Sequence, residues 1–124
     1  MELKFRFATF ADVDHYYRWV NDPIVRKNSF NQEKVKYEDH VKWFSTKINS
    51  NTCFLYLFLN EESVPVGQVR IDKEDETIID VSVDENYRGK SLSARILKLA
   101  CDDFLLKFPK EIIFATMGVK IIKI

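Results

Sequence analysis

The feature that most constrains the fold is a strand-like segment that passes through a short basic loop into a long amphipathic helix. Residues 77–83, TIIDVSV, are typical of a strand. Residues 91–108 are predicted to form a helix, because their apolar residues recur at steps of three and four. These residues are Leu92, Ile96, Leu99, Ala100 and Phe104. Pro109 ends the helix. The chain therefore passes from a strand into a helix between residues 83 and 91.

The loop between these elements has the composition of a phosphate-binding site. The sequence RGKSLS leads into the helix amino terminus, where the first amide N–H groups have no partner within the helix. Gly89 permits a tight backbone path, and Ser91 and Ser93 keep side chains small where a ligand must approach. Arg88 and Lys90 add positive charge, which favours a phosphate or pyrophosphate. An ordinary loop with Ser91 as the helix N-cap has a similar sequence, so that alternative stays open.

The amino-terminal half predicts a strand followed by two helices. Leu3, Phe5 and Phe7 alternate with basic residues and indicate the strand. Thr9, with Asp12 three residues later, begins the first helix, which ends at residues 21–23. The second helix is expected over residues 37–48, after a polar and irregular interval at residues 24–36. The residues expected to be buried are Phe10, Val13, Tyr17 and Val20 in the first helix and Val41, Phe44 and Ile48 in the second.

The remaining pattern completes an α+β order without repeats. Strands are expected over residues 53–59 and 64–71, joined by a short polar turn, and over residues 112–115 at the end of the chain. Together with the strand and helix described first, they give the order β-α-α-β-β-β-α-β. At this length we expect one domain that covers residues 1–124.

Charge and composition exclude several classes of protein. Lys and Arg total 19, as do Asp and Glu, so no overall field attracts nucleic acid or an anionic membrane. No signal peptide or membrane-spanning segment is indicated, and a cytoplasmic protein is expected. Cys53 and Cys101 lack metal-ligand spacing and are expected to be inert thiols, with a disulfide left open. His15 and His40 lack a second ligand nearby, so we expect no metal.

Residues 81–97, VSVDENYRGKSLSARIL, resemble the acetyl-CoA motif of GNAT N-acetyltransferases. That motif reads Arg/Gln-x-x-Gly-x-Gly/Ala after a strand that ends in apolar-x-Val. Arg88 matches its first position, whereas Ser91 and Ser93 stand where the family prefers Gly and Gly or Ala. The order of elements agrees over nearly the whole chain. The resemblance implies the GNAT fold, a mixed and mostly antiparallel sheet flanked by helices.

The resemblance also implies a cofactor site for acetyl-CoA. In GNAT enzymes the fourth strand, here residues 77–83, splays from the fifth, here residues 112–115, and pantetheine lies in the gap. The backbones of Val81 and Val83 would hold the pantetheine, and an amide near Val83 would polarise the thioester carbonyl. The loop residues implied to bind the cofactor are Arg88, Gly89, Lys90, Ser91, Leu92 and Ser93, with their amides on the pyrophosphate. The acceptor amine then attacks the thioester directly.

Direct attack requires that the acceptor first lose a proton to a base or to water. Asp80 is the only carboxylate inside the fourth strand and is therefore the candidate catalytic base. An exposed strand aspartate without a catalytic role is the alternative. Asp72 and Asp75, on turns, are weaker candidates, and Tyr87 is expected to pack against the loop as a structural residue.

The amino-terminal half resembles one GNAT branch, which includes acetyltransferases of bacterial amino-sugar nucleotides and of ribosomal-protein amino termini. In that branch a Trp-x-Asn segment ends the first helix, and a Glu-x-His-x-x-Trp-Phe segment forms the second. The resemblance implies that Trp19 and Asn21 contact a base or sugar and that Arg26 contacts a phosphate. Packing between helices is the alternative for each. The implied substrate is a small-molecule amine, foremost that of an amino-sugar nucleotide, with a protein or peptide amino terminus as the alternative.

The end of the chain departs from the family pattern. A GNAT sequence continues past the fifth strand into a helix and two strands that carry a Tyr, and no Tyr follows Tyr87 here. We therefore expect a C-terminally truncated fold. A homodimer is expected to cover the fifth strand, or residues 119–124 to add a strand to another copy. Two other functions stay open: an acyl-CoA-binding module without turnover, and a domain whose loop binds no nucleotide.

Overall fold

A single sheet runs through the centre of the molecule. The computed structural model describes residues 1–117 and 120–123, and their strands pair in the order β1-β2-β3-β4-β5-β6. Neighbours are antiparallel except β4 and β5, which are parallel. The strands are β1 (Lys4–Phe7), β2 (Cys53–Leu59), β3 (Pro65–Lys73), β4 (Thr77–Val83), β5 (Ile113–Met117) and β6 (Lys120–Lys123). The predicted α+β class with a mixed, mostly antiparallel sheet is confirmed.

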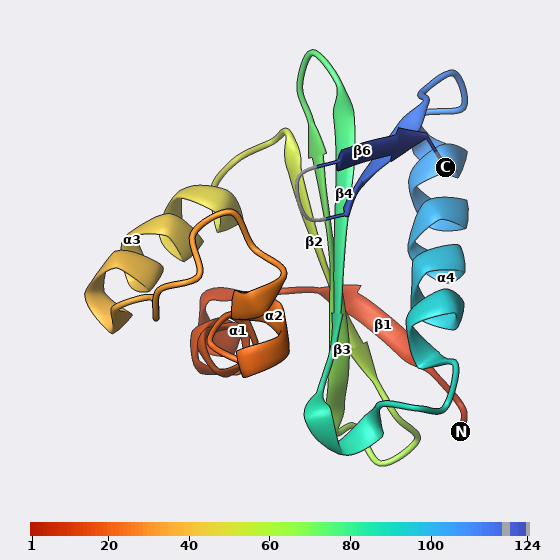
Figure 1. Cartoon of the computed structure of the whole chain (residues 1–124). Coiled ribbons are helices and arrows are strands. Elements are labelled where there is room, and N and C mark those ends of the chain that lie inside the picture. The colour runs from red at the N-terminus through yellow and green to blue at the C-terminus, as the bar shows by residue number, and fades with distance from the viewer. Residues whose placement is uncertain (118–119, 124) are drawn as a thin grey trace.

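Helices cover both faces of the sheet, as Figure 1 shows. The helices on one face are α1 (Val13–Val20), α2 (Pro23–Lys27) and α3 (Tyr37–Ile48), and α4 (Leu92–Lys107) lies on the other. The 3-10 turns η1 (Phe10–Asp12) and η2 (Glu85–Tyr87) precede α1 and α4. The predicted second helix and long last helix are confirmed to within a residue at each end. Of the helices described, none combines the length and hydrophobicity that crossing a bilayer requires.

The short helix α2 differs from the prediction, which left this segment irregular. Asp22 is its N-cap, and Asp22 Oδ1 accepts a hydrogen bond from the Ile24 amide at 2.9 Å. Pro23 occupies the first turn, where its missing N–H removes no helical hydrogen bond. The Asn-Asp-Pro sequence that ends α1 therefore also begins another helix.

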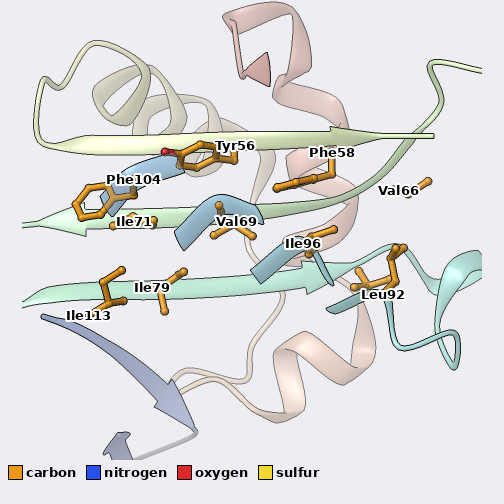
Figure 2. Close-up of a cluster of buried hydrophobic side chains, with 12 residues drawn as sticks. Tyr56, Phe58, Val66, Val69, Ile71, Ile79, Leu92, Ile96, Phe104 and Ile113 are labelled. Atoms are coloured by element: carbon orange, nitrogen blue, oxygen red, sulfur yellow. The ribbon is translucent and has the colours of Figure 1, made fainter. Parts of the chain in front are cut away.

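The face of the sheet under α4 carries the larger apolar cluster, shown in Figure 2. The sheet contributes Tyr56, Phe58, Val66, Val69, Ile71, Ile79, Val83 and Ile113, and α4 contributes Leu92, Ile96, Ala100 and Phe104. These four helical residues are buried as predicted. Leu99, also predicted to be buried, is 37% exposed. The reason is that the row of residues four apart faces the sheet, and Leu99 lies beside that row.

On the opposite face, the apolar cluster is centred on β2. Leu55, Leu57 and Leu59 pack there against Val13, Tyr16 and Trp19 of α1 and Phe44 of α3. The predicted burial of Phe44 is confirmed, and Val41 and Ile48 pack partly buried beside it. The stripe predicted for the first helix is partly wrong, since Phe10 is 49% exposed while Tyr16 and Trp19 are buried. Its first turn is the 3-10 turn η1, whose tighter winding changes which side chains face inward.

Beside that cluster, β3 and β4 present polar side chains to α1–α3. Successive residues of a strand point to opposite faces, and Val69 and Ile71 of β3 and Ile79 and Val83 of β4 belong to the cluster under α4. Their alternate residues face the other way, and the register pairs Gln68 with Ser82 and Arg70 with Asp80. This polar part of the sheet is where the site forms.

The parallel contact between β4 and β5 is short. It pairs residues 77–79 with residues 113–115 and goes no further, so within the described chain the outer edge of residues 80–83 has no partner strand. β6 pairs with β5, so the strand expected from residues 119–124 forms within the same chain and not with another copy. The hypothesis that a second copy covers this edge of β5 is thereby corrected, because β6 of the same chain covers it.

Candidate functional site

A cleft of about 910 Å³ opens beside the unpaired end of β4. Its walls come from β4, from the loop after η2, from the start of α4, and from α2 with the residues that follow it. The predicted site residues that line it are Asp80, Val81, Val83, Arg88, Gly89, Ser91, Leu92, Ser93 and Arg26. Residues assigned to base, cofactor and acceptor from separate stretches of sequence therefore share one cavity.

The first element of the site is the free edge of β4. Residues 80–83 keep strand geometry beyond the last contact with β5. Backbone N–H and C=O groups on such an edge can hydrogen-bond an extended ligand, as an added strand would. Val81 and Val83, predicted to hold pantetheine, lie in this segment and line the cleft.

The second element is the loop that leads into α4. Gly89 has φ of 81° and Ser91 has φ of 54°, so both residues are left-handed. Ser91 is the N-cap of α4, and in the described structure its side chain makes no capping hydrogen bond. The first-turn amides of α4 are consequently open, and the helix dipole adds partial positive charge there. A left-handed turn at a helix amino terminus is an arrangement suited to an anion.

The third element is the Asp80 carboxylate. Gln68 Nε2 donates to Ser82 Oγ at 2.8 Å and lies 3.4 Å from Asp80 Oδ2. Gln68 is buried, so its amide orients both residues on the cleft floor. Arg70 lies opposite Asp80 in the register, but its Nε donates to Asp72 at 2.9 Å. Asp80 is thus held in position without an ion pair to any described residue.

A comparison with known protein families identifies the family to which the chain belongs. The model described as "Acetyltransferase (GNAT) family" matches residues 13–116. The chain belongs to the GNAT acetyltransferase family. The GNAT fold predicted from the sequence is confirmed, whereas the match does not distinguish the amino-sugar branch.

Solved structures share the GNAT fold. A domain from Methanocaldococcus jannaschii DSM 2661 has a TM-score of 0.76 at 19% identity, over 92% of this chain and 76% of that chain. Spermidine N-acetyltransferase from Vibrio cholerae, solved with CoA and spermine, has a TM-score of 0.79 at 12% identity, over 91% and 69%. A dodecameric structure of spermidine N-acetyltransferase from Vibrio cholerae has a TM-score of 0.71 at 11% identity, over 91% and 68%. At these identities the likeness shows the fold alone. No curated protein sequence matches the chain.

Asp84, a residue that the sequence did not single out, connects α1 to the end of β4. Its Oδ1 accepts hydrogen bonds from Trp19 Nε1 at 2.8 Å and from Arg18 Nη2 at 2.9 Å, and its Oδ2 accepts from the Asn86 amide. Burial alone would raise the pKa of Asp84, but these three donors hold it below its ordinary value. Trp19 does not line the main cleft and instead ties α1 to the end of β4. The sequence DENY indicates a turn, but not this distant partner.

Arg88 connects the loop before α4 to the start of α2. Its Nη2 pairs with Asp22 Oδ2 at 2.6 Å, and Asp22 is the N-cap of α2. The Asp22 side chain is 8% exposed and that of Arg88 is 30% exposed, so the ion pair is largely protected from water. Arg88 therefore positions the loop against α2 in addition to lining the cleft.

Asn21 and Arg26, predicted to contact the acceptor, are engaged inside the protein. Asn21 Nδ2 donates to the Val35 carbonyl at 3.0 Å, and its Oδ1 accepts from the Val35 amide at 2.7 Å. The Arg26 guanidinium donates to the carbonyls of Val20, Asn31 and Glu33 and to Ser29 Oγ. Both side chains hold the segment after α2 in place. Contact with an acceptor stays a prediction for them.

Two further residues, Tyr87 and Lys90, come from the segment that leads into α4. Lys90 does not line the cleft, and its Nζ lies 5.8 Å from the centre of the Tyr87 ring. Tyr87, predicted to be structural, packs partly buried against the cluster under α4 and also lines the cleft. Lys90 thus contributes charge to the loop from outside the cavity wall.

Cys53, Cys101 and His40 are buried or half-buried. Cys53 and Cys101 are free, and burial raises the pKa of Cys53 to about 12 and also raises that of Cys101. The His40 ring donates from Nε2 to the Val13 carbonyl at 3.0 Å, and burial holds the pKa of His40 below its ordinary value. In residues 1–117 and 120–123, no cluster of His, Cys, Asp or Glu is arranged to hold a metal.

Proposed function

We propose that the chain is an N-acetyltransferase that moves the acetyl group of acetyl-CoA to a primary amine. The observation that carries the proposal is that one cleft joins the free edge of β4 to the left-handed loop at the start of α4. The edge suits the extended amide chain of pantetheine, and the loop suits a pyrophosphate. Membership in the GNAT acetyltransferase family supports the same donor.

In this proposal the backbones of Val81 and Val83 hydrogen-bond the pantetheine. The pyrophosphate is held by loop and first-turn amides, with Arg88 and Lys90 adding positive charge beside them. The residues whose amides take part are Gly89, Lys90, Ser91, Leu92 and Ser93. An amide near Val83 polarises the thioester carbonyl and stabilises the negative charge that develops on its oxygen.

The reaction is a direct transfer. The amine nitrogen forms a bond to the thioester carbonyl carbon, the carbon–sulfur bond breaks, and coenzyme A leaves as a thiolate. Asp80 takes one proton from the acceptor ammonium, directly or through water, and releases it to solvent. The second proton lost by nitrogen balances the one that the thiolate takes up. The products are the N-acetylated amine, the coenzyme A thiol and one proton.

The acceptor predicted from the sequence, an amino-sugar nucleotide, depended on Trp19, Asn21 and Arg26. Their polar groups make internal contacts, so we keep this acceptor as one candidate in a panel. A peptide amino terminus is a second candidate, and a polyamine is a third because a fold relative was solved with spermine. One chain supplies the cleft walls described here, so the proposed transfer does not require a homodimer. Light scattering tests whether the chain forms one.

Calorimetry with acetyl-CoA, followed by thiol release with the panel of amines, tests the proposal. Saturable binding and amine-dependent thiol release are expected. Binding without release for any amine would instead identify an acyl-CoA-binding module. Absence of binding at millimolar acetyl-CoA would contradict both functions and favour a loop that binds no nucleotide.

A further inference from the structure

Two opposite charges lie beside each other on the floor of the cleft. Arg70 of β3 and Asp80 of β4 are direct partners in the register, and both line the cleft. The Cβ atoms of directly opposed strand residues are about 5 Å apart, which is close enough for an ion pair. Nevertheless, the ion pair formed by Arg70 in the described chain is with Asp72 and not with Asp80.

Contacts on β3 and α3 explain where Arg70 points. Its Nε donates to Asp72 Oδ2 at 2.9 Å, and its guanidinium lies 5.3 Å from the centre of the Trp43 ring. Lys47 Nζ binds the other oxygen of Asp72 at 3.0 Å. Burial alone would raise the pKa of Asp72, but Arg70 and Lys47 hold it below its ordinary value. Asp72 therefore stays ionised at neutral pH and fixes one edge of the guanidinium.

The other edge of this guanidinium is available to a ligand. The Nη atoms of Arg70 donate no hydrogen bond to the residues that the structure describes, and the side chain is 30% exposed. A guanidinium presents parallel N–H groups that match the two oxygens of a carboxylate. Beside it, Asp80 presents a carboxylate that matches an ammonium group, and among the described residues its hydrogen-bond partner is the Gln68 amide.

We propose that the acceptor carries a carboxylate next to its amine, as an α-amino acid does, with Arg70 binding the carboxylate and Asp80 the ammonium. The inference rests on the proposed function, because the same ammonium gives its proton to Asp80 before attack. The transfer then yields an N-acetyl amino acid, the coenzyme A thiol and one proton. The cross-strand spacing suits an α-amino acid, whose two charged groups are attached to one carbon.

The α2 side of the cleft indicates the rest of the acceptor. Val20, Ile24, Val25 and Phe30 lie along it, and Ile24 and Phe30 are 52% and 76% exposed. Exposed apolar groups at the mouth of a cleft favour an apolar ligand group. A polyamine would bring its second cation towards Arg70, which repulsion between like charges disfavours. We therefore expect a preference for amino acids with apolar side chains.

Matched pairs of amines that differ only in the carboxylate test this proposal. The probes are L-phenylalanine with 2-phenylethylamine, and L-leucine with 3-methylbutylamine, with spermidine as the polyamine. Thiol release should give the amino acid of each pair a kcat/KM at least about tenfold higher than its partner, since a charge-assisted hydrogen bond is worth that much. An equal or higher value for the decarboxylated amines, or for spermidine, would overturn the proposal.

Variants of Arg70 connect the preference to this side chain. Arg70→Gln should raise the KM for the amino acids about tenfold and leave the decarboxylated amines nearly unchanged, whereas Arg70→Lys should restore part of the preference. Lys98→Gln, which removes one exposed charge on α4, is the control and should change neither class. An equal loss for both classes of amine in Arg70→Gln would contradict a role in carboxylate binding. Thermal unfolding of each variant shows whether the fold is retained.

A binding measurement keeps this test separate from the test of the proposed function. L-Phenylalanine is titrated by calorimetry into the protein saturated with coenzyme A, and into the free protein if coenzyme A does not bind. Binding that Arg70→Gln weakens supports the amino acid site even where no thiol is released. Absence of amino acid binding from both forms overturns the site, while binding of acetyl-CoA with transfer to other amines would leave the proposed function standing.

Discussion

The two faces of β3 and β4 carry different chemistry on a shared backbone. Toward α4, Val69, Ile71 and Ile79 are almost completely buried in one apolar cluster (Figure 2). Toward α1–α3, their alternate neighbours Arg70 and Asp80 are charged, half-buried and open to the cleft. A shift of one residue in register would exchange the two faces, so the alternation fixes both together.

The difference indicates that one face of the sheet stabilises the fold and the other forms the site. Burial of apolar side chains under α4 stabilises the strands, so substitutions there should act on folding. The polar face adds little apolar burial and costs desolvation of its charges, so substitutions there should act on binding or transfer. Substitutions on the two faces should therefore separate effects on stability from effects on activity.

The largest effect is expected on the α4 face, for Phe104→Ala. Phe104 is fully buried, and its ring lies 5.4 Å from that of Phe54 and 4.9 Å from that of Phe108, measured between centroids. Its removal should lower the free energy of unfolding by about 3–5 kcal/mol in urea denaturation. Leu106→Ala on the same helix, at an 83% exposed position, should change it by less than about 0.5 kcal/mol. Similar losses in both variants would show that α4 does not pack as described.

The next effect is expected on the polar face, for Asp80→Asn. Loss of a general base should lower kcat/KM for the best amine about 100-fold, or about 2.7 kcal/mol of activation free energy. The free energy of unfolding should change by less than about 0.5 kcal/mol, because Gln68 Nε2 can still donate to the amide oxygen that replaces the carboxylate. Asp102→Asn, at an exposed position on α4, is the control with unchanged kcat/KM. A destabilised Asp80→Asn protein with normal turnover would show that Asp80 supports the fold and does not act as the base.

A smaller effect is expected at the loop, for Arg88→Glu. The change removes the ion pair with Asp22 and places a negative charge beside the proposed pyrophosphate site. The dissociation constant for acetyl-CoA should rise about tenfold or more in calorimetry. Lys110→Glu, a charge reversal at an exposed turn far along the chain, should leave it unchanged. An unaltered dissociation constant in Arg88→Glu would place the cofactor elsewhere.

The smallest effect compares the two serines of the motif. Ser91 has a left-handed φ of 54°, so Ser91→Gly should relieve strain and raise the free energy of unfolding by about 0.5–1 kcal/mol. Ser93 lies inside the first turn of α4, where Ser93→Gly should lower it by a similar amount. Acetyl-CoA affinity should be retained in Ser91→Gly. A change of the unfolding temperature in the same direction for both variants would contradict the left-handed assignment of Ser91.

Local patterns predicted most of the scaffold. The period of four in Leu92, Ile96, Ala100 and Phe104 located α4, and apolar segments separated by short polar turns located β2 to β4. Both patterns depend on residues that are close in sequence, so they can be recognised without a structure. α2 was missed although Asp22-Pro23 is a recognisable helix start, because the same residues also end α1.

Contacts between distant parts of the chain could not be predicted in the same way. Asp84 is bound by Trp19, which lies 65 positions earlier, and no local periodicity indicates that partner. The orientation of Arg70 depends on Asp72 and on Lys47 of α3, so its role on the cleft floor emerged only from the fold. Residues 119–124 were expected to add a strand to another copy, whereas β6 pairs with β5 of the same chain, and no local pattern distinguishes these two partners.

In the proposed function, the cleft between β4 and the start of α4 binds acetyl-CoA. Titration of the 15N-labelled protein with acetyl-CoA, followed by NMR, tests it most directly. Saturable shifts at the amides of Val81 and Val83 and of residues 89–93 are expected, with little change along β1 and β2. Shifts confined to other elements, or none at millimolar acetyl-CoA, would contradict binding of the cofactor in this cleft.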